Sequence, residues 1–183
     1  MKTRICQLHV VLTLLIISFA WNPGVSHADG PGEYEVKGAF LYHFANFVRW
    51  PESTFKTTDG HLRVCILGKD PFGHILEETL EKKTVKDHPF EIHRNPSKTE
   101  LQHCHMLYFA ASESPQMKTL HHHIAKGEVL TFGEDLEFMR QGGMVQFFVK
   151  DQKVQFAINP EVVNQTQLKV SSKLLRLAEI VSP

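Results

Sequence analysis

The run Leu62-Arg63-Val64-Cys65-Ile66-Leu67, followed by Gly68-Lys69-Asp70-Pro71-Phe72-Gly73, decides the fold class of this 183-residue chain. Its first part is short and largely apolar, which predicts a buried strand. In the turn that follows, Asp70 suits the N-cap of a helix and Pro71 suits the first helical turn. We expect that helix to run to about Lys82. A strand, a glycine-containing turn and a helix in this order begin a βαβ unit.

The same alternation of strand and helix signals continues on both sides of this segment. We expect further strands at 90–93, 106–110, 129–132, 144–150 and 154–158, and further helices at 33–50, 114–127, 134–141 and 171–181. The last two strands flank Asp151-Gln152-Lys153, which predicts a hairpin. Strands that alternate with helices form a mainly parallel sheet covered on both faces. The predicted fold is therefore α/β with three layers, flavodoxin- or Rossmann-like in outline, with a C-terminal antiparallel hairpin at the sheet edge.

The beginning of the chain has the order of a secretory signal peptide. Lys2 and Arg4 precede the apolar stretch Val10–Trp21, and small residues end at Ala28. We expect cleavage after Ala28, so that residues 1–28 are removed and 29–183 form a single domain outside the cytosol. An uncleaved membrane anchor is the alternative, which the short apolar stretch disfavours. The exported part is mildly acidic, which argues against nucleic acid and against an electrostatic hold on membrane lipid.

Export would also remove Cys6 and leave two cysteines, Cys65 and Cys104. A disulfide requires Cα atoms within about 7 Å, so a bond between them would make the strands at 62–67 and 106–110 neighbours. The 2-1-3 strand order of doubly wound sheets places them so. Two buried free thiols are the alternative. A catalytic dithiol is disfavoured because the spacing is not Cys-x-x-Cys.

Histidines are abundant, but their spacing does not predict a metal site. On a helix, the consecutive side chains of His121-His122-His123 diverge by about 100° and cannot converge on one ion. His103 and His105 would share a face of an extended segment and could chelate as a pair, yet no third ligand has an obvious spacing. We therefore expect hydrogen-bonded or solvated histidines, with a protonation switch as a weaker alternative.

Motifs of known enzyme classes are missing from the sequence. There is no Gly-x-Ser-x-Gly, no Walker A loop, no Gly-x-Gly-x-x-Gly and no His-Glu-x-x-His. We predict neither catalysis nor a cofactor. A possible ligand-binding loop is formed by Gly68, Lys69, Asp70 and Gly73, because small ligands bind open α/β sheets where strands end and helices begin. A turn with a helix cap is the simpler interpretation, and it also applies to Glu134, which follows another strand.

Aromatic residues are concentrated in the helix expected at 33–50. Its inward face accounts for Phe40, Phe44 and Phe47. Tyr42 and Trp50 lie off that face, and exposed aromatic side chains often mark binding patches. Tyr42 and Trp50 are therefore candidate interface residues, although core or partial burial is the favoured explanation for both.

Several stretches together have a recognisable order and spacing: Glu35–Phe44, Phe47–Pro51, Cys65–Gly73, Cys104–Phe109, Ser112-Glu113, Val129–Thr131, Gly142–Val145 and Leu168–Ala178. With them the chain resembles the YfiR family of small exported bacterial proteins, over nearly all of its exported length. The resemblance implies a periplasmic α/β regulator that binds and represses the periplasmic sensor domain of a membrane-bound diguanylate cyclase. It also implies relief by an OmpA-like outer-membrane lipoprotein, a homodimer, and a disulfide at the positions of Cys65 and Cys104.

The chain departs from the family in one respect. A second cysteine pair found in some members near the C-terminal hairpin has no counterpart in Met144–Ile158. Redox sensing through a second bridge is therefore not expected. The alternative function is a periplasmic small-ligand-binding module coupled to another membrane system, with its pocket at the loop Gly68–Gly73.

Overall fold

The computed structural model describes residues 32–120, 124 and 128–181. The expected signal peptide, its cleavage site after Ala28 and the three histidines at 121–123 lie outside these residues. Within them, no helix combines the length and the apolar character that a membrane crossing requires.

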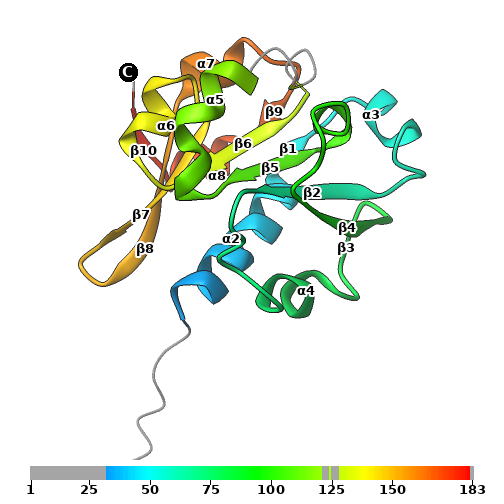
Figure 1. Ribbon diagram of the computed structural model, residues 1–183, viewed down its shortest axis with the longest axis horizontal. Helices are drawn as coiled ribbons and strands as arrows, with labels where there is room; N and C mark the ends of the chain where they lie inside the picture. The colour runs from blue at the N-terminus through cyan, green and yellow to red at the C-terminus, as the bar shows by residue number, and fades with distance from the viewer. Residues whose placement is uncertain (1–31, 121–123, 125–127, 182–183) are drawn as a thin grey trace, which may run out of the picture. The chain divides into compact units, whose positions relative to one another are not determined.

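An eight-stranded sheet forms the centre, in the order β10-β8-β7-β6-β5-β2-β4-β3 (Figure 1). The strands are β2 (Leu62–Leu67), β3 (Thr84–Val85), β4 (His88–Arg94), β5 (Met106–Phe109), β6 (Leu130–Gly133), β7 (Val145–Lys150), β8 (Lys153–Ile158) and β10 (Glu179–Ile180). Strands β4, β2, β5, β6 and β7 are mutually parallel, and β8 pairs antiparallel with β7. The predicted mainly parallel sheet with a C-terminal hairpin is confirmed.

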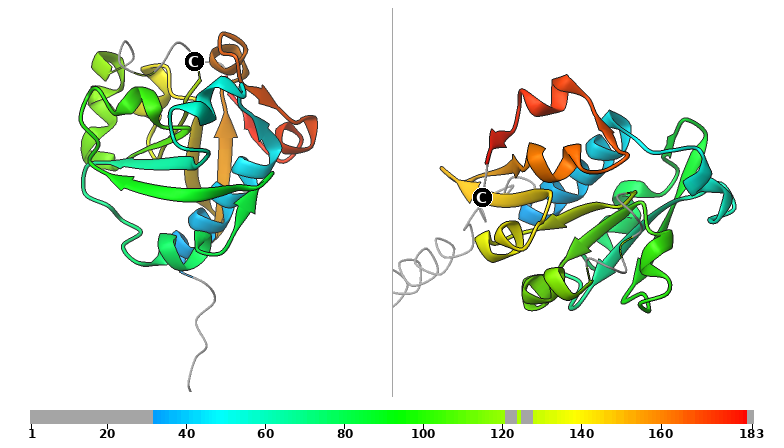
Figure 2. Two further views of the ribbon diagram at one scale, coloured as in Figure 1. Left: turned by 90° about the vertical axis from the view of Figure 1, so that its right-hand side faces the viewer. Right: turned by 90° about the horizontal axis from the view of Figure 1, so that it is seen from above.

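Helices cover both faces of this sheet, so the predicted three layers are also confirmed. They are α2 (Glu33–Phe47), α3 (Ser53–Lys56), α4 (Ile75–Leu80), η2 (Leu101–His103), η3 (Ala111–Gln116), α5 (Met117–Leu120), α6 (Leu136–Arg140), α7 (Pro160–Asn164) and α8 (Ser172–Leu175). One apolar core contains residues of α2, α3, α4, α7 and α8, and a second contains residues of η2, α5 and α6. Figure 2 shows α2 and α8 on one side of the sheet and α5 and α6 on the other.

The connections around β2 give the sheet its switch point. From β2 the chain reaches β4 on one side, and it then returns to β5 on the other side of β2. The expected 2-1-3 order is therefore present as β4-β2-β5. In the register of these strands, Cys65 lies beside His93 of β4 and Leu107 of β5.

Helix α2 ends three residues earlier than expected and buries a different face. Val48–Arg49 is a short strand, β1, which pairs antiparallel with β9 (Lys169–Val170). The pairing of β-branched Val48 with Val170 replaces the last helical turn. The buried positions of α2 are Lys37, Gly38, Leu41, Phe44 and Ala45, whereas Phe40 and Phe47 are half-buried.

Two other helices are shorter than the sequence predicts. Helix α4 begins at Ile75, because the Asp70 side chain accepts a hydrogen bond from the Phe72 N–H within the turn and does not cap the helix. The helix expected at 171–181 is wrong beyond Leu175: the chain turns into β10, which pairs parallel with β8. Apolar spacing fits either structure over so few residues, and the open edge of β8 decides between them. As a result β10, not the hairpin, forms that edge of the sheet.

Candidate functional site

The disulfide joins β2 to the segment that leads into its neighbour β5, inside the second core. Cys65 of β2 and Cys104, which follows η2, are bonded with their Cα atoms 5.9 Å apart. Both residues are buried, at 0% and 4% exposure. The predicted pair is thus present, and the alternative of two free thiols is wrong.

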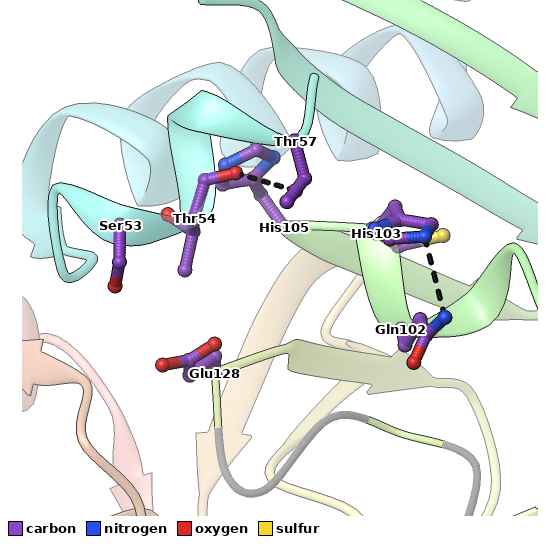
Figure 3. A pocket seen from close by; sticks show the side chains of 8 residues that line it. Ser53, Thr54, Thr57, Gln102, His103, His105 and Glu128 are labelled. Atoms are coloured by element: carbon purple, nitrogen blue, oxygen red, sulfur yellow. Dashed lines mark hydrogen bonds between the residues drawn. The ribbon is translucent and has the colours of Figure 1, made fainter.

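A pocket of about 210 Å³ lies beside this disulfide, at the amino ends of β5 and β6. Most of its lining residues have polar side chains, but they expose apolar atoms as well as polar ones to the pocket: Ser53, Thr54, Thr57, Gln102, His103, Cys104, His105 and Glu128. Figure 3 shows Glu128 on one side, Ser53 and Thr54 of α3 on another, and Gln102 and His103 of η2 on a third. This is the opposite end of the parallel strands from the loop that the sequence suggested.

His105 is the most deeply placed polar residue of this region, with 1% exposure. Its Nδ1 accepts a hydrogen bond of 3.0 Å from the backbone N–H of Arg63. A neutral imidazole with an accepting Nδ1 carries its proton on Nε2. That Nε2 has no hydrogen-bond partner in the part of the chain that the structure describes. Burial, with the nearby His88 and Arg63, lowers the pKa of His105 to about 4.

The two histidines that flank Cys104 have different environments. His103 is half-buried at the end of η2, and its Nε2 lies 3.3 Å from the Gln102 side-chain nitrogen. His105 lies just before β5, where its Nδ1 accepts the hydrogen bond from the Arg63 N–H. No group of three or more potential metal ligands occurs among the residues with described positions. Gln102 and His103 present side-chain hydrogen-bonding groups to the pocket.

The loop Gly68–Gly73 is occupied by the protein's own contacts. The two carboxylate oxygens of Asp70 accept hydrogen bonds from the Phe72 N–H at 2.8 Å and from Nε of Arg94 at 2.7 Å. Gly68 has a φ of +92°, and a Cβ at this position would lie 2.5 Å from Cγ of Glu113. The Gly73 carbonyl accepts from Arg94, while Lys69 is exposed. A structural role explains the glycine, the aspartate and the arginine, and ligand binding by this loop stays a prediction.

A buried ionic cluster at the carboxyl ends of the strands was missed by sequence reasoning. Lys37 of α2 is only 1% exposed and pairs with two carboxylates, Glu33 and Glu134, the latter at 2.9 Å. The hydroxyls of Tyr108 and Tyr34 both donate to Glu134. The available signal was the i, i+4 spacing of Glu33 and Lys37, which brings the two side chains together on a helix.

The environment of this cluster raises the pKa of both tyrosine hydroxyls. Burial and the negative charge of Glu134 raise the pKa of Tyr34 to about 12. The same two causes raise the pKa of Tyr108 well above its ordinary value. Both tyrosines therefore remain hydrogen-bond donors to Glu134 at any physiological pH, and the cluster fastens α2 to β5 and β6.

The two candidate interface residues differ in the structure. Trp50 is only 7% exposed, and its Nε1–H donates to the His105 carbonyl at 3.0 Å. Burial, the explanation favoured for Trp50 over an interface role, is therefore what the structure shows, and the indole N–H has its partner inside the protein. Tyr42 is half-buried beside Phe90, with the Lys83 ammonium 4.5 Å from its ring centre.

Comparisons with known proteins agree with this architecture. Residues 34–179 match the model of the family described as YfiR/HmsC-like, which confirms the resemblance seen in the sequence. A crystal structure of a conserved domain protein from Vibrio cholerae O1 biovar El Tor strain N16961 is similar, with a TM-score of 0.54 and 8% identity. The alignment covers 82% of this chain and 60% of that one, so it speaks for the fold alone. No curated protein matches the chain.

Proposed function

Because the chain belongs to the YfiR/HmsC-like family, we propose that it binds and represses the periplasmic sensor domain of a membrane-bound diguanylate cyclase. The observation that carries the proposal is the family match, which extends over residues 34–179 and so over all the elements of the sheet but the last residue of β10. The family implies a periplasmic regulator and not an enzyme. Repression would limit the synthesis of cyclic-di-GMP in the cytoplasm.

Export to the periplasm after cleavage at Ala28 is part of this proposal. The Cys65–Cys104 disulfide supports it, because disulfides persist in oxidising compartments outside the cytosol. Relief of repression by an OmpA-like outer-membrane lipoprotein and a homodimeric state also belong to the proposal. Tyr42 remains its candidate interface residue, since part of its ring is accessible.

The direct test is co-expression of the full chain with a membrane-bound diguanylate cyclase that has a periplasmic sensor domain. Cellular cyclic-di-GMP should fall when the chain is exported and should stay high when residues 1–28 are deleted. Capture of the purified periplasmic domain of the cyclase by the purified chain tests contact separately. Unchanged cyclic-di-GMP together with failure of capture would contradict the proposal.

A small-ligand sensor is the second candidate function, and the polar pocket beside the disulfide favours it. A thermal-shift screen of small polar metabolites tests this candidate. A saturable shift that is lost in Glu128→Gln would place the ligand in the pocket. A shift that is lost in Asp70→Asn instead would place it at the loop Gly68–Gly73. If no compound produces a saturable shift, this candidate is rejected for the compounds screened.

A further inference from the structure

Three rings form a continuous stack at the amino ends of the parallel strands. Phe55 of α3 lies between His88 of β4, at 3.7 Å between ring centres, and His105, at 4.5 Å. The interplanar angles are 8° and 25°, so both imidazoles lie flat on the phenylalanine ring. We call His88, Phe55 and His105 the Phe55 stack. Phe55 is the buried residue by which the short helix α3 is held.

The hydrogen bonds of His105 fix it in the uncharged form. Its Nδ1 accepts from the Arg63 N–H, so its one proton is on Nε2. A second proton could be added only at Nδ1, where it would face the hydrogen of the Arg63 amide. Protonation of His105 therefore requires that this bond break. The backbone around it is also paired, since the His105 N–H donates to the Arg63 carbonyl at 2.9 Å.

The charged groups near His105 also favour its uncharged form. His88 approaches from β4, and Arg63 approaches from β2 with its guanidinium held by Glu91 at 2.9 Å. Phe55 and Trp50, which pack on the ring from α3 and from the segment after β1, carry no charge. Glu128 and His103 lie across the pocket, and Glu128 is half-exposed. No carboxylate hydrogen-bonds the buried ring among the contacts of the described residues.

We propose that the Phe55 stack is an acid-sensitive latch, in which a proton taken from solvent by Nδ1 of His105 breaks the bond to Arg63 and releases α3. Residues of helix α3 form one side of the pocket that Cys104 also lines, so the release of α3 opens this pocket. The latch is closed at neutral pH and opens on acidification. It goes beyond the proposed function, and its test requires no cyclase.

The direction of the pH dependence follows from linkage. In the closed form the pKa of His105 is about 4, below the ordinary value of 6.5. The closed form is therefore fully favoured above pH 6.5 and loses stability as the pH falls toward 4. The opening constant should rise about tenfold for each pH unit below 6.5, and about 300-fold over the whole range.

Hydrogen exchange of the Arg63 amide measures the latch directly. We would follow exchange by NMR between pH 7.5 and 4.5 and correct the rates for their intrinsic pH dependence. The opening constant derived for the Arg63 amide should then rise as the pH falls. The Leu107 amide in the centre of β5 is the internal reference, since the middle of the sheet opens only on global unfolding. Proton uptake by His105 favours every state that releases its ring, so both opening constants should rise with acid, but the Leu107 amide should stay far better protected than Arg63 at each pH. Equal protection of Arg63 and Leu107 over the whole range would show that Arg63 exchanges only by global unfolding and would overturn the latch.

His105→Asn is the decisive variant, because its Oδ1 can accept from the Arg63 N–H but cannot take up a proton. The pH dependence at Arg63 should disappear in this variant and persist in His43→Asn, in which an exposed histidine is replaced. A pH dependence that survives His105→Asn would overturn the proposal.

If His105→Asn does not fold, the nitrogen chemical shifts of the wild-type His105 imidazole test the latch instead. His105 should remain in the Nε2–H form down to about pH 5 and gain its second proton together with loss of Arg63 protection. Protonation at pH 6 to 7 with the Arg63 amide still protected would overturn the latch.

Discussion

The two ends of the parallel strands bury polar groups in opposite ways. At the carboxyl end, Lys37 is held between two carboxylates, and Glu134 also accepts from Tyr108 and Tyr34. At the amino end, His105 is uncharged, stacked on Phe55, and fastened through one backbone amide. The first arrangement stabilises charge by pairing it, whereas the second excludes charge from the site.

Because of this difference, we expect the two ends of the strands to respond differently to a change in pH. Removing one partner of a buried ion pair leaves an uncompensated charge and is destabilising, so the carboxyl end resists change. A buried neutral histidine can be charged by one proton, so the amino end can respond to its surroundings. The pocket and the disulfide both lie at the responsive end.

The largest decrease in the free energy of unfolding is expected when the disulfide at the amino end is removed. Cys65 and Cys104 are 39 residues apart, and a loop of that length stabilises the folded state by about 4 kcal/mol in the chain-entropy account. Urea unfolding of the double variant Cys65→Ala and Cys104→Ala should show this loss. A reducing agent should produce a similar loss in the wild type and no further loss in the double variant. A loss below about 1 kcal/mol would show that the bond does not stabilise the responsive end.

The next largest effect is expected at the carboxyl end, from Lys37→Met. The change leaves the partly exposed carboxylates of Glu134 and Glu33 without their shared cation, and the free energy of unfolding should fall by about 2 kcal/mol. Lys173→Met, on the exposed surface of α8, is the matched control and should change it by less than about 0.5 kcal/mol.

A double variant sharpens this result. Adding Glu134→Gln to Lys37→Met removes the unpaired charge, so the double variant should lose less than the sum of the two single changes. Additive losses would mean that Lys37 and Glu134 do not interact and that the carboxyl end is not held by charge.

The sequence predicted the fold well and the site only in part. Strand positions, the 2-1-3 order and the disulfide followed from apolar runs and from the position of the two cysteines. Lys37 was missed because a lysine on an apolar helix face is usually solvated, and its partner Glu134 lies 97 residues away in the chain. The Phe55 stack was missed because Phe55, His88 and His105 belong to separate segments that only the folded sheet edge brings together.

A smaller effect is expected from Tyr108→Phe at the carboxyl end. The hydroxyl of this buried residue donates to Glu134, and a hydrogen bond to a charged group contributes about 1.5 kcal/mol. Tyr34→Phe removes a longer bond of 3.4 Å to the same carboxylate from a half-buried residue, so its loss should be below about 0.5 kcal/mol. Urea unfolding of both variants ranks the two donors. Equal losses would contradict the view that the buried tyrosine is the main partner.

The smallest effect is expected from Asp70→Asn, in the loop that the sequence suggested as a ligand site. Asparagine can still accept from the Phe72 N–H, and Arg94 keeps its two bonds to Glu77. The lost ion pair involves a partly exposed arginine, so the free energy of unfolding should fall by at most about 0.5 kcal/mol. A loss near 2 kcal/mol would show that the loop is a third fastening point, comparable to the Lys37 cluster. A small loss of stability combined with loss of a ligand-induced thermal shift would instead make the loop a binding site, and the carboxyl end would then be responsive as well.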